Sequence, residues 1–182
     1  IILDALERGD LGQGRTLIDS TSGNTGVAYA MLGSALGIPV TLVMPSNVSQ
    51  ARKDIIAAYG AEIIYSDPLE GSDGAIRLAK QLVADDHSGK YYYPDQYANA
   101  SNPRAHELST APEILRDTDG RITHFVAGLG TTGTVMGTGR GLKRHDPSIQ
   151  ICAVEPDAAF HGLEGLKHLA SSLVPPIFEE TG

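Results

Sequence analysis

The first glycine-rich turn of the chain is Thr21-Ser22-Gly23-Asn24-Thr25-Gly26, and it directly follows a short apolar strand predicted at residues 16–18. The Ala- and Leu-rich stretch from Asn24 to Ala35 predicts a helix that begins inside this turn. The first N–H groups of such a helix have no partner within it, and the helix dipole adds partial positive charge there. The sequence therefore predicts an anion-binding site at this turn, and its polar side chains suit a carboxylate.

A second turn of the same kind is Gly128-Leu129-Gly130-Thr131-Thr132-Gly133-Thr134, between a strand predicted at 122–127 and a helix predicted at 132–145. Three of its residues carry hydroxyl groups. A phosphate monoester has more charge than a bridging diphosphate and accepts more hydrogen bonds, so it suits such a loop. Two anion-binding turns on one chain indicate a ligand with two anionic parts, or an anionic cofactor beside an anionic substrate.

The rest of the chain alternates between helical and strand patterns. Repeated β–α units imply parallel strands, right-handed crossovers and helices on both faces. We therefore expect an α/β fold with two open, mostly parallel α/β/α sheets that are incomplete at both ends. The polar stretch 95–102 predicts the crossing between a smaller domain, residues 1–100, and a larger domain, residues 101–182. Further strands are expected at 40–44, 61–65, 91–93 and 149–154, and further helices near 1–8, 48–59, 75–84 and 103–116.

Composition narrows the class of protein. The 182 residues carry a formal net charge of −8, which argues against a nucleic-acid or membrane-surface partner. No apolar run is long enough to span a bilayer, and the histidines show no metal-ligand spacing. Cys152 is the single cysteine, so no internal disulfide forms and a reducing cytoplasm is expected. We therefore predict a protein without a metal and without a nucleic-acid or membrane partner.

A dinucleotide site is one alternative. Gly128, Gly130 and Gly133 match the pattern G-x-G-x-x-G, and Glu155 ends the next predicted strand, where an acidic residue meets a ribose hydroxyl. A nicotinamide-dependent oxidoreductase of the Rossmann type therefore stays open. The threonines of the second turn weaken this alternative, and it gives no reason for the first turn.

The two turns together resemble motifs of the pyridoxal-phosphate-dependent enzymes of the tryptophan synthase β type (fold type II). Within that fold the chain is most similar to cysteine synthases, also called O-acetylserine sulfhydrylases, of the B branch. The resemblance runs in order along nearly the whole chain. It also includes Pro94-Asp95-Gln96-Tyr97 with Asn102-Pro103, Val154-Glu155-Pro156, the segment His161–His168, and Val174-Pro175.

The resemblance implies which residues bind the cofactor pyridoxal 5′-phosphate and which bind the substrate. It implies that the cofactor is contacted by Asn24, Gly130, Thr131, Thr132, Gly133, Thr134 and Gly162. It implies that the carboxylate of an amino-acid substrate is bound by Thr21, Ser22, Gly23, Asn24, Thr25 and Gln96.

The family's Schiff-base lysine precedes the first turn in a Lys-Asp-Arg context, and this chain has no lysine before Lys53. We therefore expect that lysine upstream of Ile1, place no catalytic residue in this chain, and expect an internal piece that is inactive alone. The parent is expected to be a homodimer that makes L-cysteine from an O-activated L-serine and a sulfur donor. Cystathionine β-synthase and serine or threonine dehydratase are alternatives of the same fold. A non-catalytic ligand-binding module is an alternative of another class.

Overall fold

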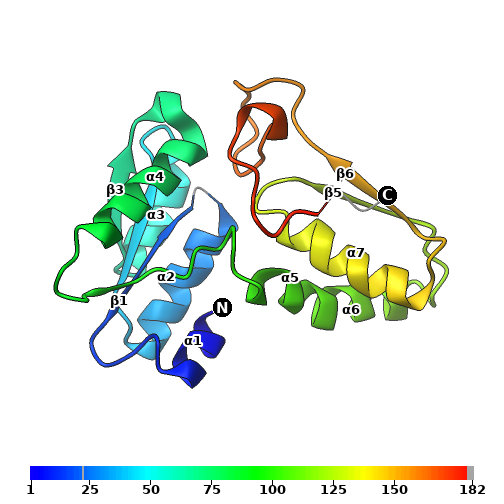
Figure 1. The fold of residues 1–182 in the computed structure, drawn as a ribbon, viewed down its shortest axis with the longest axis horizontal. Helices are drawn as coiled ribbons and strands as arrows, with labels where there is room; N and C mark the ends of the chain where they lie inside the picture. Colours follow the sequence, from blue (N-terminus) through cyan, green and yellow to red (C-terminus); the bar gives the residue numbers. More distant parts are fainter. Residues whose placement is uncertain (22, 180–182) are drawn as a thin grey trace. The chain divides into compact units, whose positions relative to one another are not determined.

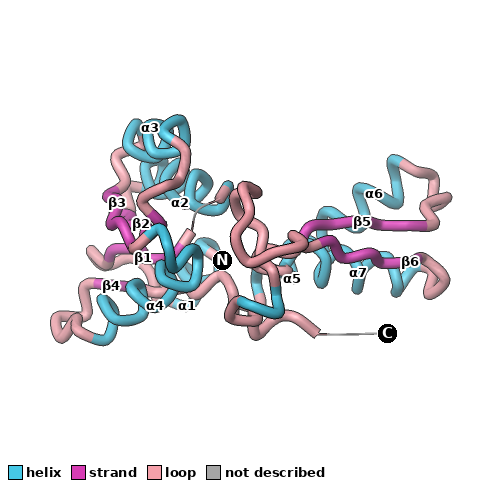
Figure 2. The backbone as a smooth tube through the Cα atoms, turned by 90° about the horizontal axis from the view of Figure 1, so that it is seen from above, coloured by secondary structure: helices cyan, strands magenta, loops and turns pink. Residues whose placement is uncertain are grey.

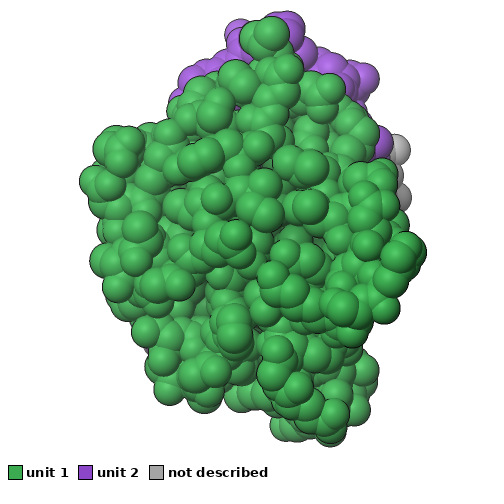
Figure 3. Space-filling view, turned by 90° about the vertical axis from the view of Figure 1, so that its left-hand side faces the viewer, with its two compact units in different colours: residues 1–95 green, residues 96–182 purple. Residues whose placement is uncertain are grey.

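The computed structural model describes residues 1–21 and 23–179. The chain forms two compact units, Ile1–Asp95 and Gln96–Gly182, which Figure 3 shows in different colours. Ser22, which was predicted to bind substrate, lies outside the described residues. The division between these two units falls directly before Gln96.

The first unit, whose helices are labelled in Figure 1, is built on a four-stranded sheet in the order β3-β2-β1-β4, with all four strands labelled in Figure 2. Every neighbouring pair is parallel, so the prediction of a parallel sheet is confirmed. The register places Leu17 beside Val40 and Thr16 beside Tyr91. The strands are β1 (Thr16–Ser20), β2 (Val40–Pro45), β3 (Glu62–Ser66) and β4 (Tyr91–Tyr92).

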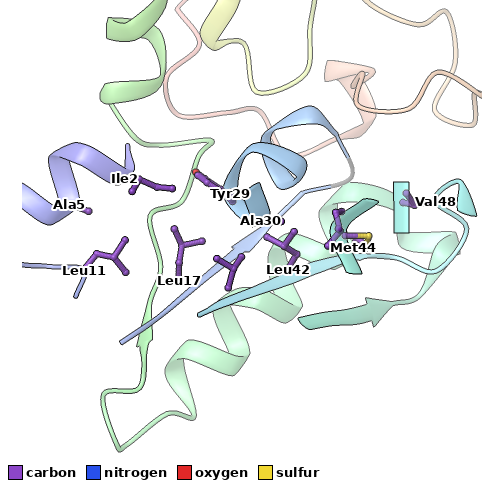
Figure 4. Close-up of a cluster of buried hydrophobic side chains, with 11 residues drawn as sticks. Ile2, Ala5, Leu11, Leu17, Tyr29, Ala30, Leu42, Met44 and Val48 are labelled. Atoms are coloured by element: carbon purple, nitrogen blue, oxygen red, sulfur yellow. The ribbon is translucent and has the colours of Figure 1, made fainter. Parts of the chain in front are cut away.

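Helices cover both faces of this sheet. Every residue of β1 and β2 is buried, which matches their nearly continuous apolar sequence. Leu17 and Leu42 pack with α1, α2 and α3 on one face (Figure 4), whereas Ile18 and Val43 pack with α4 on the other. The helices are α1 (Ile2–Arg8), α2 (Asn24–Leu36), α3 (Gln50–Ala58), the 3₁₀ helix η1 (Pro68–Glu70) and α4 (Gly71–Ala84).

The second unit contains the parallel pair β5 (His124–Gly128) and β6 (Gln150–Val154), which run side by side in Figure 2. Helix α7 (Gly133–His145) joins the two strands, so this unit repeats the β–α–β pattern. Cys152 is half-buried in β6. Leu142 and Ile149 form a buried core with Ala111. A short 3₁₀ helix, η3 (Leu169–Ser171), lies near the end of the described residues.

A continuous helical stretch lies alongside α7. It consists of α5 (Ser101–Ala105), the π-helical turn η2 (His106–Thr110) and α6 (Ala111–Asp117). Pro112 has no N–H to donate, so a regular α-helical hydrogen bond is impossible at this point. A π turn is one way for a helix to pass such an interruption, and π turns occur often at functional sites.

Among the described residues, no helix is both long enough and apolar enough to cross a bilayer. The same part of the chain holds no group of three or more metal-ligating side chains close enough to bind an ion.

Candidate functional site

The first turn is organised by the hydroxyl group of Thr21, directly after β1. Thr21 Oγ1 accepts hydrogen bonds from the N–H of Gly23, over 3.3 Å, and from the N–H of Gly26, over 3.2 Å. Thr21 is itself buried. Its oxygen therefore closes the turn. Because the N–H of Thr21 donates to the carbonyl of Val43 over 2.9 Å, the hydroxyl hydrogen is the donor that Thr21 has left for a substrate.

Gly26 is required by close packing at this turn. A Cβ atom at this position would lie 2.5 Å from Thr21 Cγ2 and 3.3 Å from Leu42 Cδ1. Side chains do not tolerate such distances in a packed interior. The glycine therefore lets the first turn of α2 rest directly on the hydroxyl residue that organises the loop.

The open side of the turn faces solvent and carries positive character. Gly23 caps α2 with an extended backbone, Asn24 is exposed and Thr25 is half-buried. The first N–H groups of a helix lack helical partners, and an anion is stabilised there. Arg52 of α3 adds a formal charge, because its Nη1 lies 3.8 Å from the position that a Cβ of Gly23 would occupy. This arrangement can hold a carboxylate.

A buried polar pair lies behind the turn. Asp19 of β1 is fully buried, and its Oδ1 accepts from the N–H of Ser20 while its Oδ2 accepts from the hydroxyl of Tyr29 on α2. Burial, and then the nearby Asp19 carboxylate, raise the pKa of Tyr29. The tyrosine therefore stays protonated and remains a donor to Asp19.

The second turn contains a strained residue with an unpartnered polar group. Thr132 adopts a left-handed backbone with φ 69°, which is rare for a β-branched residue. Its Oγ1 is buried and has no hydrogen-bond partner among the described residues. Strain of this kind costs about 1–3 kcal/mol and is concentrated at functional sites. A bound anion beside the turn would give this buried hydroxyl a partner.

Two glycines of the second turn let other segments approach closely. At Gly130 a Cβ would collide with the carbonyl oxygen of Gly165, and at Gly133 it would collide with the side-chain amide of Asn102. Lys167 lies beside the same turn, because its N–H donates to the carbonyl of Leu129 over 2.7 Å. The turn is therefore packed against residues 102 and 165–167.

The side-chain hydroxyls of the other two threonines in the turn have hydrogen-bond partners. Thr131 Oγ1 accepts from Asn102 Nδ2 over 3.0 Å and from the N–H of Gly133 over 3.4 Å. Thr134 Oγ1 lies 3.2 Å from His106 Nε2 in the π turn, and the other ring nitrogen lies 3.0 Å from Thr110 Oγ1. Burial lowers the pKa of His106, so the neutral ring is favoured.

The same unit places Gln96 close to the second turn. Gln96 is 2% exposed, and its carbonyl accepts from Asn102 Nδ2 over 2.8 Å. Gly162 behaves differently, because it is exposed and no atom lies within 4 Å of its would-be Cβ. Its role near the cofactor remains a prediction.

Glu155 has a structural partner. Its Oε2 accepts from the N–H of Leu169 over 2.7 Å, which anchors the start of η3 to the end of β6. An acidic residue that binds a ribose has to offer its carboxylate to the ligand. The observed bond therefore accounts for Glu155 without a nucleotide.

The second turn fits a phosphate monoester. The 13-residue helix α7 begins at Gly133 and turns its N-terminal end towards the loop residues that precede it. Its positive end, the unpartnered Thr132 hydroxyl and the hydroxyl of Thr131 supply donors that such an anion accepts. The residues present are therefore compatible with the phosphate of pyridoxal phosphate, whose binding at this turn the family resemblance implied.

Comparison with known proteins agrees with this geometry. The family model for pyridoxal-phosphate dependent enzymes matches residues 1–178, and the chain belongs to this family. The match does not favour the dinucleotide alternative. The chain is 57% identical over 181 residues to a protein named cysteine synthase from Aquifex aeolicus, covering 100% of this chain and 55% of that protein. It is 43% identical to cysteine synthase B from Pseudomonas aeruginosa, covering 94% of this chain and 56% of that protein.

Solved structures show the same fold. A cysteine synthase from Entamoeba histolytica aligns with a TM-score of 0.86 at 35% identity, covering 98% of this chain and 54% of that one. A hydrogen sulfide-producing enzyme from Fusobacterium nucleatum aligns with a TM-score of 0.90 at 30% identity, covering 98% of this chain and 62% of that enzyme. The expectation of fold type II is thereby confirmed. The chain spans about half the length of the curated relatives that it matches.

Sequence reasoning assigned no role to Asn102, Gly165 or Lys167. Asn102 was noticed as part of an Asn-Pro motif, but its two contacts come from residues 6 and 29 positions away. Lys167 is 2% exposed and lies over the ring of Tyr97, 5.3 Å from the ring centre. No local pattern predicts such contacts, because they depend on how distant segments fold together.

Proposed function

We propose that this chain is part of a cysteine synthase, which forms L-cysteine from an O-activated L-serine and a sulfur donor with pyridoxal phosphate. The observation that carries the proposal is the second turn, where the strained Thr132 presents a buried, unpartnered hydroxyl before the start of α7. The names of the Aquifex aeolicus and Pseudomonas aeruginosa relatives support the choice of reaction within the family.

The two units contribute different binding functions to this proposal. In the second unit, residues 130–134 hold the cofactor phosphate, and Gln96 contacts the substrate. In the first unit, the hydroxyl hydrogen of Thr21 and the N–H groups of Asn24 and Thr25 at the start of α2 bind the substrate carboxylate. When bound, the cofactor supplies the electron sink that stabilises negative charge at the substrate's α-carbon. The protein side chains orient the substrate and keep its carboxylate fixed during the reaction.

The lysine that attaches the cofactor and moves the α-proton is predicted to lie before Ile1. Without that lysine we expect the isolated chain to form no site-specific covalent bond to the cofactor. To test this expectation, the isolated chain is incubated with pyridoxal phosphate, reduced with borohydride and analysed by peptide mapping. A single lysine of this chain that is reduced stoichiometrically contradicts it.

The proposed reaction is tested on the full-length enzyme that carries this sequence. We expect cysteine to form when an O-activated serine, such as O-acetylserine, O-phosphoserine or O-ureidoserine, is supplied with sulfide. Unactivated serine and threonine serve as controls for dehydratase activity. Cystathionine formed from serine and homocysteine, or a 2-oxo acid formed from the unactivated amino acids, contradicts the assignment.

We further propose a homodimer in the cytoplasm, with sulfide or a sulfur carrier as the donor. Light scattering of the full-length enzyme measures its mass, and a monomer at all concentrations contradicts the dimer. Competition between sulfide and thiosulfate in the cysteine assay identifies the preferred small donor.

A further inference from the structure

The side-chain amide of Asn102 joins two segments that the proposed function uses separately. Asn102 lies near the start of α5, and its Nδ2 donates to the carbonyl of Gln96 over 2.8 Å and to Thr131 Oγ1 over 3.0 Å. An amide nitrogen carries two hydrogens, so these two bonds use its whole donor capacity. The Asn102 amide group also packs directly against Gly133, because it fills the space that a Cβ at this position would need.

The second of these bonds decides how Thr131 uses its hydroxyl group. A hydroxyl oxygen has two acceptor positions and one hydrogen. Thr131 Oγ1 accepts from Asn102 Nδ2 and from the N–H of Gly133, which occupies both acceptor positions. The hydroxyl hydrogen is then left to donate, and chained hydrogen bonds strengthen one another. The Thr131 hydroxyl is therefore limited to the role of a donor towards an anion at the turn.

We propose that Asn102 is a positioning residue with two effects. It orients the Thr131 hydroxyl as a donor to the cofactor phosphate, and it fixes the position of the Gln96 backbone relative to Thr131. The identity of the substrate rests on the proposed function, whereas the effect on phosphate binding does not. Asn102 itself touches neither reacting atom. Its contribution is to make phosphate affinity and substrate-carboxylate affinity depend on one side chain.

Two substitutions in the full-length enzyme test the first part of this proposal. Asn102→Ala removes both donors, and Asn102→Asp replaces the donors with an acceptor that captures the Thr131 hydrogen and adds negative charge near the phosphate. Because either change lets the Thr131 hydroxyl turn away from the phosphate, we expect the Kd for pyridoxal phosphate to rise about tenfold or more. The Kd for pyridoxal, which has no phosphate, should stay within about twofold.

A double-mutant cycle separates this role from a general structural one. In a Thr131→Val background, Asn102→Ala should add little further loss of phosphate affinity, because the hydroxyl through which Asn102 acts is already gone. Thr131→Ser keeps the hydroxyl and should restore the effect of Asn102→Ala. Equal losses of affinity for pyridoxal and pyridoxal phosphate, or fully additive losses with Thr131→Val, overturn the proposal. Should the Asn102 variants fail to fold, similar phosphate affinities of Thr131→Val and Thr131→Ser overturn it as well.

Asn99→Asp is the matched control. It makes the same change three residues earlier, and its Oδ1 keeps the bond that it accepts from the N–H of Ser101 over 3.0 Å. We expect phosphate affinity to change less than twofold in this variant. The coupling to Gln96 is measured as the KM for the amino-acid substrate at saturating cofactor, which should rise in Asn102→Ala. An unchanged KM overturns the coupling. Affinity effects in an enzyme that forms no cysteine contradict the proposed reaction but leave the phosphate role standing.

Discussion

Tyr29 Oη on α2 donates a hydrogen bond to Asp19 Oδ2 on β1 over 3.2 Å, and the carboxylate that receives it is fully buried. Asp19 lies two residues before the hydroxyl of Thr21, and Tyr29 lies three residues after Gly26. The bond therefore joins the strand and the helix on either side of the first turn. A buried carboxylate is tolerated only when its hydrogen bonds are made, so this pair stabilises the geometry of the turn.

Removing the Tyr29 hydroxyl should destabilise the protein without disturbing the packing of its ring. For Tyr29→Phe we expect the free energy of unfolding to fall by about 1–3 kcal/mol, because a buried charged acceptor loses a donor. Denaturant titration measures this change. Tyr59→Phe is the control, since Tyr59 is 38% exposed at the end of α3. Equal stabilities of the two variants contradict the importance of the buried pair.

An added methyl group at Gly26 should disturb the first turn. The new Cβ meets Thr21 Cγ2 at 2.5 Å, so Gly26→Ala is expected to lower stability by about 1–3 kcal/mol. At Gly23 the nearest atom is 3.8 Å away and φ is −120°, so Gly23→Ala should cost much less. Thermal unfolding of both variants checks the contrast. A Gly26→Ala variant as stable as Gly23→Ala shows that the packing can relax.

Thr132→Gly should raise the stability of the protein and lower its affinity for the cofactor. Glycine adopts a left-handed backbone without strain, so the variant is expected to gain about 1 kcal/mol of folding free energy. It also loses the buried hydroxyl, so its affinity for pyridoxal phosphate should fall about tenfold. Chemical unfolding and cofactor titration are measured on the same preparation. A variant with unchanged affinity contradicts the assignment of this hydroxyl to the phosphate.

His106 predicts a pH dependence of stability. Burial lowers its pKa from the ordinary value of 6.5, so the unfolded chain binds the proton first as the pH falls. This histidine therefore costs no stability above pH 6.5, and stability is lost as the pH falls from about 6.5 towards the lower pKa of the folded state. His106→Gln should flatten this part of the profile. Denaturant unfolding between about pH 5 and 8 measures it, and parallel profiles for both proteins contradict the prediction.

Most of the fold follows from local sequence patterns. The apolar run 40–44 predicted a strand buried on both faces, and β2 is buried throughout. The helix predicted from Asn24 begins at that residue. Gly23 precedes it as the cap, and the Ala- and Leu-rich sequence that follows favours a helix. The helix predicted at 103–116 is a single helical stretch, but its π turn was not foreseen. Pro112 was the available signal for that irregularity.

The sequence by itself determined the order of strands and helices along the chain, the position of both glycine-rich turns and the family to which the chain belongs. These properties depend on periodicity, glycine placement and hydroxyl groups within short windows, all of which are visible along the chain. Only the tertiary structure decided that Asn102 serves both Gln96 and Thr131, that Thr132 is strained and lacks a partner, and that Lys167 is buried over Tyr97. Hydrogen-bond partners and burial depend on which distant segments meet in space, and no spacing along the chain records that.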